Sequence, residues 1–176
     1  MDEPRAARAG ATDDAGVRSQ VGRILMSEEA VYGLILVSGM IVVSNGVAGT
    51  SLNALLTVVV TVIVFFAAHV YAGTIARLAS EENIDLGASI TAAARHSVGM
   101  LLVSVIPAAL LLLGVIHLLD DEAAIWFALL ADTVVLGVLG WIAVSRWTPR
   151  FWPRVASALI TAAFGLAITA LKVLIH

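Results

Sequence analysis

The sequence predicts an all-α integral membrane protein, a bundle of five transmembrane helices. Composition is the first reason: 60% of the 176 residues are hydrophobic and 13% are charged, whereas soluble domains carry about 25% charged residues. The second is that the apolar residues gather into five segments, each long enough to cross a hydrocarbon core of roughly 30 Å as a helix. We predict helices at about 28–48, 54–79, 97–118, 123–145 and 155–175.

The segment before the first helix has a different composition. Residues 1–23 are rich in Ala, Gly, Asp and Arg and show no apolar periodicity, so we predict a disordered cytoplasmic tail followed by one transmembrane domain at 24–176. A signal peptide is the alternative, because Arg18 and Arg23 precede an apolar run and 46–48 resembles a cleavage site. The run is longer than an ordinary signal-peptide core, which favours a retained helix.

Six of the thirteen acidic residues stand just before a predicted helix or in its first turn, where the positive end of the helix dipole favours them. They are Glu28, Glu29, Asp85, Asp120, Asp121 and Glu122. We interpret them as caps. Ser27 is suited to cap the first helix, residues 88–96 are a candidate helical lead-in to the third, and Pro153 suits the beginning of the fifth.

The positive charges predict the orientation. If the N-terminus is cytoplasmic, nine of the ten Lys and Arg residues face the cytoplasm and only Lys172 faces outside, as the positive-inside rule requires. We therefore predict a multi-pass protein of the cell membrane with an external C-terminus. One cytoplasmic loop has the residues of an interfacial anchor that faces anionic lipid. These are Arg146, Trp147, Arg150, Trp152 and Arg154.

Asp132 lies near the middle of the fourth segment, 123–145. A charged side chain at that depth costs about 2.5–3.5 kcal/mol even on the lenient insertion scale, so it needs a reason. One interpretation is an ion or proton site. The other is a protonated or paired carboxyl group that fixes helix packing.

Two further polar residues lie inside predicted helices. Lys172 leans toward the level of Asp132 and can form a buried pair with it, or it can extend to the outer interface. His69 lies on the cytoplasmic side of its helix midpoint, and a histidine near an intramembrane Asp is typical of a proton relay. The alternative is a neutral His69 that is hydrogen-bonded to a hydroxyl or a backbone carbonyl.

These residues lead to two hypotheses for the function. The first is a small ion- or proton-conducting or transporting protein that uses Asp132, with His69 and Lys172 as tuning partners. The second is a non-catalytic membrane subunit or scaffold whose polar residues serve helix packing. We predict neither an enzyme nor a cofactor or metal site, because there is no cysteine and no nucleophile–base or metal-ligand spacing.

Small residues recur every four positions on two predicted helices, which predicts close contacts between helix backbones. One row is Ala68, Ala72 and Ala76, and the other is Ser157, Thr161, Gly165 and Thr169. We expect these rows to contact either each other or a second copy. The partners we expect are the lipid bilayer and a homo-oligomer or a larger membrane complex. Nucleic acid is not expected, because the basic residues are spread over short loops.

Overall fold

The computed structural model describes residues 28–80 and 85–175, and the regular secondary structure of this part is entirely helical. The helices are α2 (Glu28–Ala48), α3 (Ser51–Ser80), α4 (Leu86–Val115), α5 (Asp121–Ser145) and α6 (Phe151–Ile175). All five are long and apolar enough to cross a membrane, which confirms the predicted all-α class with five membrane-length helices. The predicted tail at 1–23 and the Ser27 cap lie outside the described residues.

Four helices begin earlier than predicted, and polar partners hold the first turns of two of them, α3 and α4. The backbone N–H of Ser51 donates to Asp121 Oδ1 at 2.9 Å, so α3 begins three residues before the predicted position 54. Asp85 caps α4 by accepting a hydrogen bond from the Ala88 N–H at 3.0 Å. The predicted lead-in at 88–96 is therefore part of α4, which runs unbroken from Leu86.

The predicted end of the third helix and the predicted beginning of the fifth also shift. The third helix ends at Val115 instead of 118, because His117 has a φ of 59°, in the left-handed region where an α-helix terminates. The fifth begins at Phe151 instead of 155, so that Pro153 falls in its first turn, where a missing N–H is tolerated. Asp120 caps α5 through the Ala123 N–H, as its position predicts.

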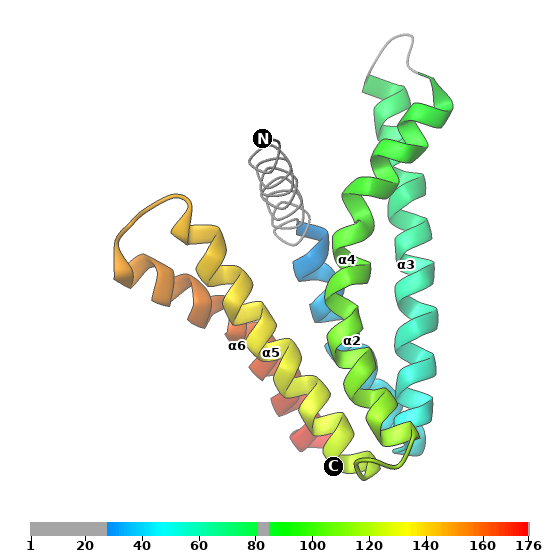
Figure 1. The fold of residues 1–176 in the computed structure, drawn as a ribbon, viewed down its shortest axis with the longest axis vertical. Helices are drawn as coiled ribbons and strands as arrows, with labels where there is room; N and C mark the ends of the chain where they lie inside the picture. Colours follow the sequence, from blue (N-terminus) through cyan, green and yellow to red (C-terminus); the bar gives the residue numbers. More distant parts are fainter. Residues whose placement is uncertain (1–27, 81–84, 176) are drawn as a thin grey trace, which may run out of the picture.

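The helices form two antiparallel pairs, and α2 packs against both of them (Figure 1). The helices α3 and α4 pack side by side, as do α5 and α6, and α2 contacts each of the other four. In Figure 1 the α5–α6 pair diverges from α3 and α4 toward one end of the molecule, and the two pairs approach at the end where α4 passes into α5. The two pairs are therefore packed together both by α2 and by the direct contact of α4 with α5.

The core consists of two apolar clusters stacked along α2. One contains Val37 and Ile41 of α2 with Leu129 of α5, and the other contains Leu34 of α2 with Leu136 of α5. Much of the apolar surface of α3 and α6 faces outward, which suits helices that contact lipid.

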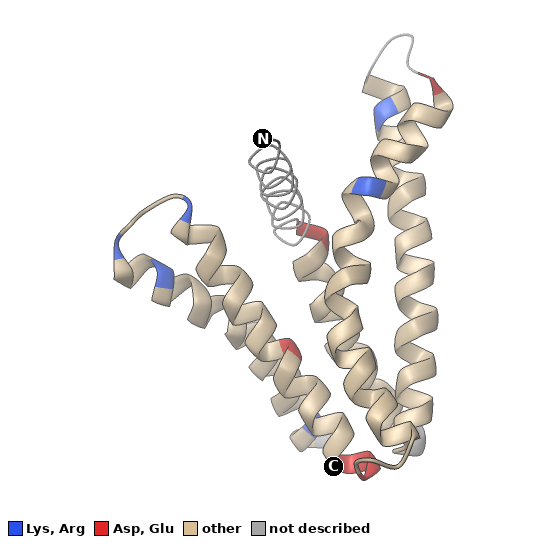
Figure 2. Ribbon diagram, viewed as in Figure 1, with Lys and Arg blue, Asp and Glu red and all other residues tan. Residues whose placement is uncertain are grey.

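The arginines and one acidic turn lie toward opposite ends of the long axis (Figure 2). Arginines lie toward the end where α3 passes into α4 and α5 into α6, and the acidic turn 120–122 lies at the opposite end. The positive-inside rule requires the arginines of these two connections to lie on the same side, and they do lie toward the same end. The side of the membrane on which each terminus lies stays a prediction.

Candidate site around the buried Asp132

Asp132 is completely buried, with 0% of its surface exposed. Ser38 of α2 donates its hydroxyl hydrogen to Asp132 Oδ2 at 2.7 Å. The second carboxyl oxygen, Oδ1, has no hydrogen-bond partner in the described part of the chain. The contact joins two helices that lie far apart in the sequence and leaves half of the carboxyl group unsatisfied.

The two residues form a polar layer between the two apolar clusters. Along α5, Asp132 lies between Leu129 of one cluster and Leu136 of the other. Along α2, Ser38 lies likewise between Leu34 and Ile41. Such surroundings have a low dielectric constant, in which an unpaired polar atom is expensive.

A proline lies in the stretch of α4 that corresponds to this layer. Pro107 is fully buried, and it lies between Val103 of one cluster and Leu111 of the other. A proline has no N–H, so it cannot donate the helical hydrogen bond that the Val103 carbonyl would otherwise accept. The middle of the bundle therefore has a missing helical hydrogen bond in α4 besides the unpaired Oδ1 of Asp132.

Neither protonation state of Asp132 satisfies both of its oxygens in this arrangement. An ionised carboxylate would be a buried negative charge with one neutral donor, Ser38, and no positive partner among residues 28–80 and 85–175. A protonated carboxyl group would have a hydroxyl hydrogen without an acceptor at Oδ1. In these surroundings the Asp132 carboxyl group is therefore suited to bind and release a proton or another ligand.

Lys172 does not pair with Asp132. Its ammonium nitrogen lies 4.2 Å from the centre of the Trp126 ring, a cation–π contact between α6 and α5. Since Trp126 is six residues before Asp132 on α5, the ammonium lies about 9 Å from the level of Asp132 along that helix. Only 5% of the surface of Lys172 is exposed.

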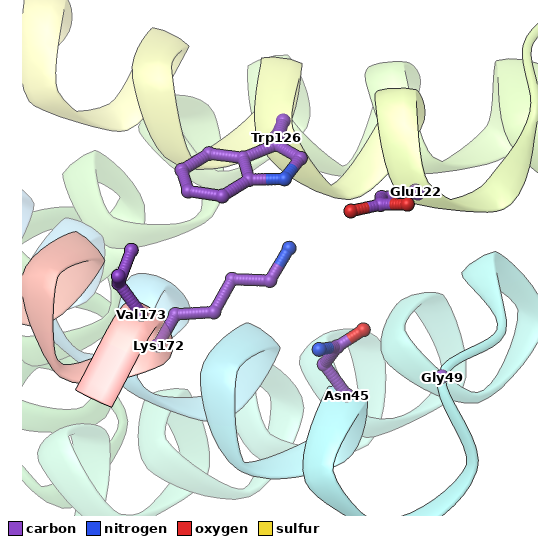
Figure 3. Close-up of a pocket in the computed structure, with 6 residues that line it drawn as sticks. All are labelled: Asn45, Gly49, Glu122, Trp126, Lys172 and Val173. Atoms are coloured by element: carbon purple, nitrogen blue, oxygen red, sulfur yellow. The ribbon is translucent and has the colours of Figure 1, made fainter. Parts of the chain in front are cut away.

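The Lys172 ammonium faces a cavity of about 460 Å³ at the acidic end of the bundle (Figure 3). The cavity is also lined by Asn45, Gly49, Glu122, Trp126 and Val173. Figure 3 shows the lysine side chain between Trp126 and Asn45, with the Glu122 carboxylate on the same side as the ammonium. Of the two predicted arrangements, the geometry fits a lysine that extends toward the end of the bundle.

His69 is also separate from the Asp132 contact. Its Nδ1 lies 2.9 Å from the carbonyl oxygen of Phe65 on its own helix, and the two rings are 5.5 Å apart. Because a carbonyl only accepts, Nδ1 carries the hydrogen in this bond. His69 and Tyr32 of α2 line the same pocket on the outer surface of the bundle. The arrangement matches the predicted alternative, a histidine bound to a backbone carbonyl.

The predicted interfacial anchor occupies the connection between α5 and α6. Trp147 and Trp152 are exposed, as are Arg146 and Arg150. Arg154 donates to two backbone carbonyls near the end of α5, those of Ser145 and Thr148. Such exposed aromatic and basic side chains suit the boundary between membrane and water.

Sequence reasoning did not identify Ser38 as the partner of Asp132. Ser38 and Ser44 both lie on the apolar helix α2, and both are buried. The Ser44 hydroxyl donates to the Ile41 carbonyl of its own helix, whereas that of Ser38 donates to α5. Only the packing of α2 against α5 distinguishes the two serines.

Comparison with protein-family models, with curated proteins and with solved structures finds no match for this chain. The function is therefore inferred from the geometry of the site itself.

Proposed function

We propose that this chain is a small integral membrane protein that transports protons across the bilayer through Asp132. The observation that carries the proposal is the unpartnered Oδ1 of a completely buried carboxyl group. Ionisable residues inside membrane helices are expensive, and proton relays are among the functions that retain them.

A proton fits this site better than a metal cation. Hard metal cations take several oxygen ligands, commonly six or more. Within the described part of the chain, one hydroxyl group donates to Asp132, that of Ser38, and the neighbouring Thr133 hydroxyl donates to the Leu129 carbonyl at 3.0 Å. Protonation needs only the free carboxyl oxygen.

In this mechanism Ser38 stabilises the ionised form of Asp132, because a hydroxyl that donates to a carboxylate favours its charge. Apolar clusters lie on both sides of the pair. Proton exchange therefore requires the contact between α2 and α5 to open, so that water reaches Oδ1 from one side at a time. The Ser38 hydrogen bond breaks or shifts in that step.

The test is proton flux into liposomes that contain the purified full chain and an internal pH-sensitive dye, under an imposed membrane potential. We expect flux above that of protein-free liposomes. Asp132→Asn keeps the shape and cannot ionise, so it should reduce the flux to background. Asp120→Asn is the matched control, because this exposed residue caps the same helix and Asn also serves as a cap.

A packing role for Asp132 is the second candidate, and the hydrogen bond that joins α2 to α5 favours it. The protein would then be a non-catalytic membrane subunit or scaffold. A folded Asp132→Asn protein that transports protons like the wild type would reject Asp132 as the carrier. A wild type without flux under a pH or potential gradient would reject transport itself.

The location we propose is the cell membrane, with a cytoplasmic N-terminus and an external C-terminus. The chain has no cysteine, so single cysteines can be introduced and labelled without background. A cysteine at Asp121 should react with an impermeant reagent added outside intact cells, and one at Arg150 should react only after permeabilisation. The opposite pattern would reverse the orientation.

A further inference from the structure

We propose that Glu28, Glu29 and His96 form a binding site for one divalent transition-metal ion, such as Zn²⁺, at the end of the bundle where α2 begins. The site is independent of the proposed proton transport. One ligand atom from each of the three side chains lies within 4.8 Å of the other two. Two come from the first turn of α2 and one from α4.

The two central ligands already touch. His96 Nε2 lies 2.8 Å from Glu29 Oε1. The Glu29 side chain is only 7% exposed, whereas 65% of the His96 side chain is exposed. The exposed imidazole of His96 therefore gives an ion from solution access to the buried carboxylate of Glu29.

Glu29 is incompletely satisfied by this contact. Its second oxygen, Oε2, is buried and has no hydrogen-bond partner in the part of the chain that the structure describes. A buried carboxylate oxygen without a donor is costly, and a cation is the partner that satisfies it best. The unsatisfied oxygen distinguishes this cluster from a group of solvated acids.

The packing of α2 against α4 brings the ligands together. Gly33 lies one turn after Glu29, and Met100 lies one turn after His96. A Cβ placed on Gly33 would lie 2.7 Å from Met100 Cγ and 3.2 Å from its Cα. Only a glycine allows the two backbones to approach this closely, and that approach sets Glu29 beside His96.

The donor set determines the class of ion. One imidazole nitrogen and two carboxylate oxygens suit Zn²⁺ and similar transition metals, whereas Mg²⁺ and Ca²⁺ prefer oxygen alone. Ligand bonds of about 2.0–2.2 Å require a tighter cluster than 4.8 Å. Glu28 is exposed, so its side chain has room to rotate toward the ion. Three protein ligands leave a fourth position for water.

The test is calorimetric titration of the chelator-stripped full chain, without a histidine tag, with ZnCl₂ in detergent. We expect one tight site in the wild type. Glu29→Gln and His96→Ala should each weaken Zn²⁺ binding at least roughly tenfold, because each removes a direct ligand. His69→Ala is the matched control, because His69 is bound to its own helix, and it should leave Zn²⁺ affinity unchanged.

Substitution with Co²⁺ gives a second readout, because its visible absorption reports coordination by the protein and should disappear in His96→Ala. Helical content measured by circular dichroism verifies that the variants fold. Because Glu28 is exposed, Glu28→Gln removes one of the proposed ligands without disturbing the core. A wild type that binds no Zn²⁺ at millimolar concentration overturns the proposal. Equal affinity in the wild type and in folded His96→Ala also overturns it.

Discussion

The contact between α5 and α6 and the contact between α5 and α2 are built in different ways. Between α5 and α6, small residues let the backbones meet. Gly140 of α5 faces Ser157, whose hydroxyl donates to the Gly140 carbonyl at 2.9 Å, and Gly165 of α6 faces Thr133. Between α5 and α2, larger aliphatic side chains surround one buried hydrogen bond.

The difference shows two ways of holding helices together where lipid is as apolar as the protein. Burial of aliphatic side chains gives little advantage over lipid, so close packing and interhelical hydrogen bonds become important. The α5–α6 contact depends on small side chains, and the α2–α5 contact depends on a specific polar pair. Added volume should therefore break the first contact, and loss of a hydroxyl group should weaken the second.

The largest effect is expected from Gly165→Leu. A Cβ at Gly165 would lie 2.9 Å from Thr133 Cα, a backbone atom that can move only if the two helices separate. Overpacking typically costs about 1–3 kcal/mol and sometimes more. We expect a clearly lower Tm in detergent, or loss of the folded protein, measured by thermal unfolding with size-exclusion chromatography.

The matched control is Gly39→Leu on α2, since nothing lies within 4 Å of a Cβ placed there. Its Tm should stay close to that of the wild type. If Gly165→Leu were as stable as this control, α5 and α6 would not pack through their small residues.

A smaller loss is expected from Ser38→Ala, which tests the second contact. The change removes the only hydrogen bond that the structure shows for the Asp132 carboxyl group. A buried group left without its partner costs about 1–3 kcal/mol. The comparable variant Ser104→Ala should cost less, because that buried hydroxyl donates only to the Leu101 carbonyl of its own helix.

A double variant separates the hydrogen bond from the packing. Replacing both polar partners by apolar residues is often close to neutral. Ser38→Ala combined with Asp132→Leu should therefore recover part of the Tm lost in Ser38→Ala alone. No recovery would mean that the polar pair itself does not determine the stability of this contact.

The features that could be predicted from the sequence are those that depend on neighbouring residues. Apolar length determines the five helices, and the Asp85 and Asp120 caps act on N–H groups three residues later. The left-handed His117, which shortens α4, lacks a local signal such as glycine. Local rules therefore account for most of the fold and for little of the candidate site.

The candidate site depends on contacts between distant segments. The depth of Asp132 in its helix predicts an unusual group, because that depth follows from chain position alone. Its partner Ser38 depends on how α2 rotates against α5, and the Glu29–His96 contact depends on the close approach at Gly33. Sequence spacing cannot report these helix rotations, since they result from the packing of the whole bundle.

The smallest effect is expected from Ala72→Leu on α3. Ala68, Ala72 and Ala76 have the same spacing as the small residues of α6, but all three are exposed in this chain. A leucine at an exposed membrane position contacts lipid without penalty, so the Tm of the monomer should not change. If the row instead packs against a second copy, as the predicted homo-oligomer allows, Ala72→Leu should shift the protein toward monomer. Light scattering in detergent, with Gly39→Leu as the reference, distinguishes the two results. Since the two rows share one sequence pattern, the result would also show whether that pattern alone is enough to produce helix contact.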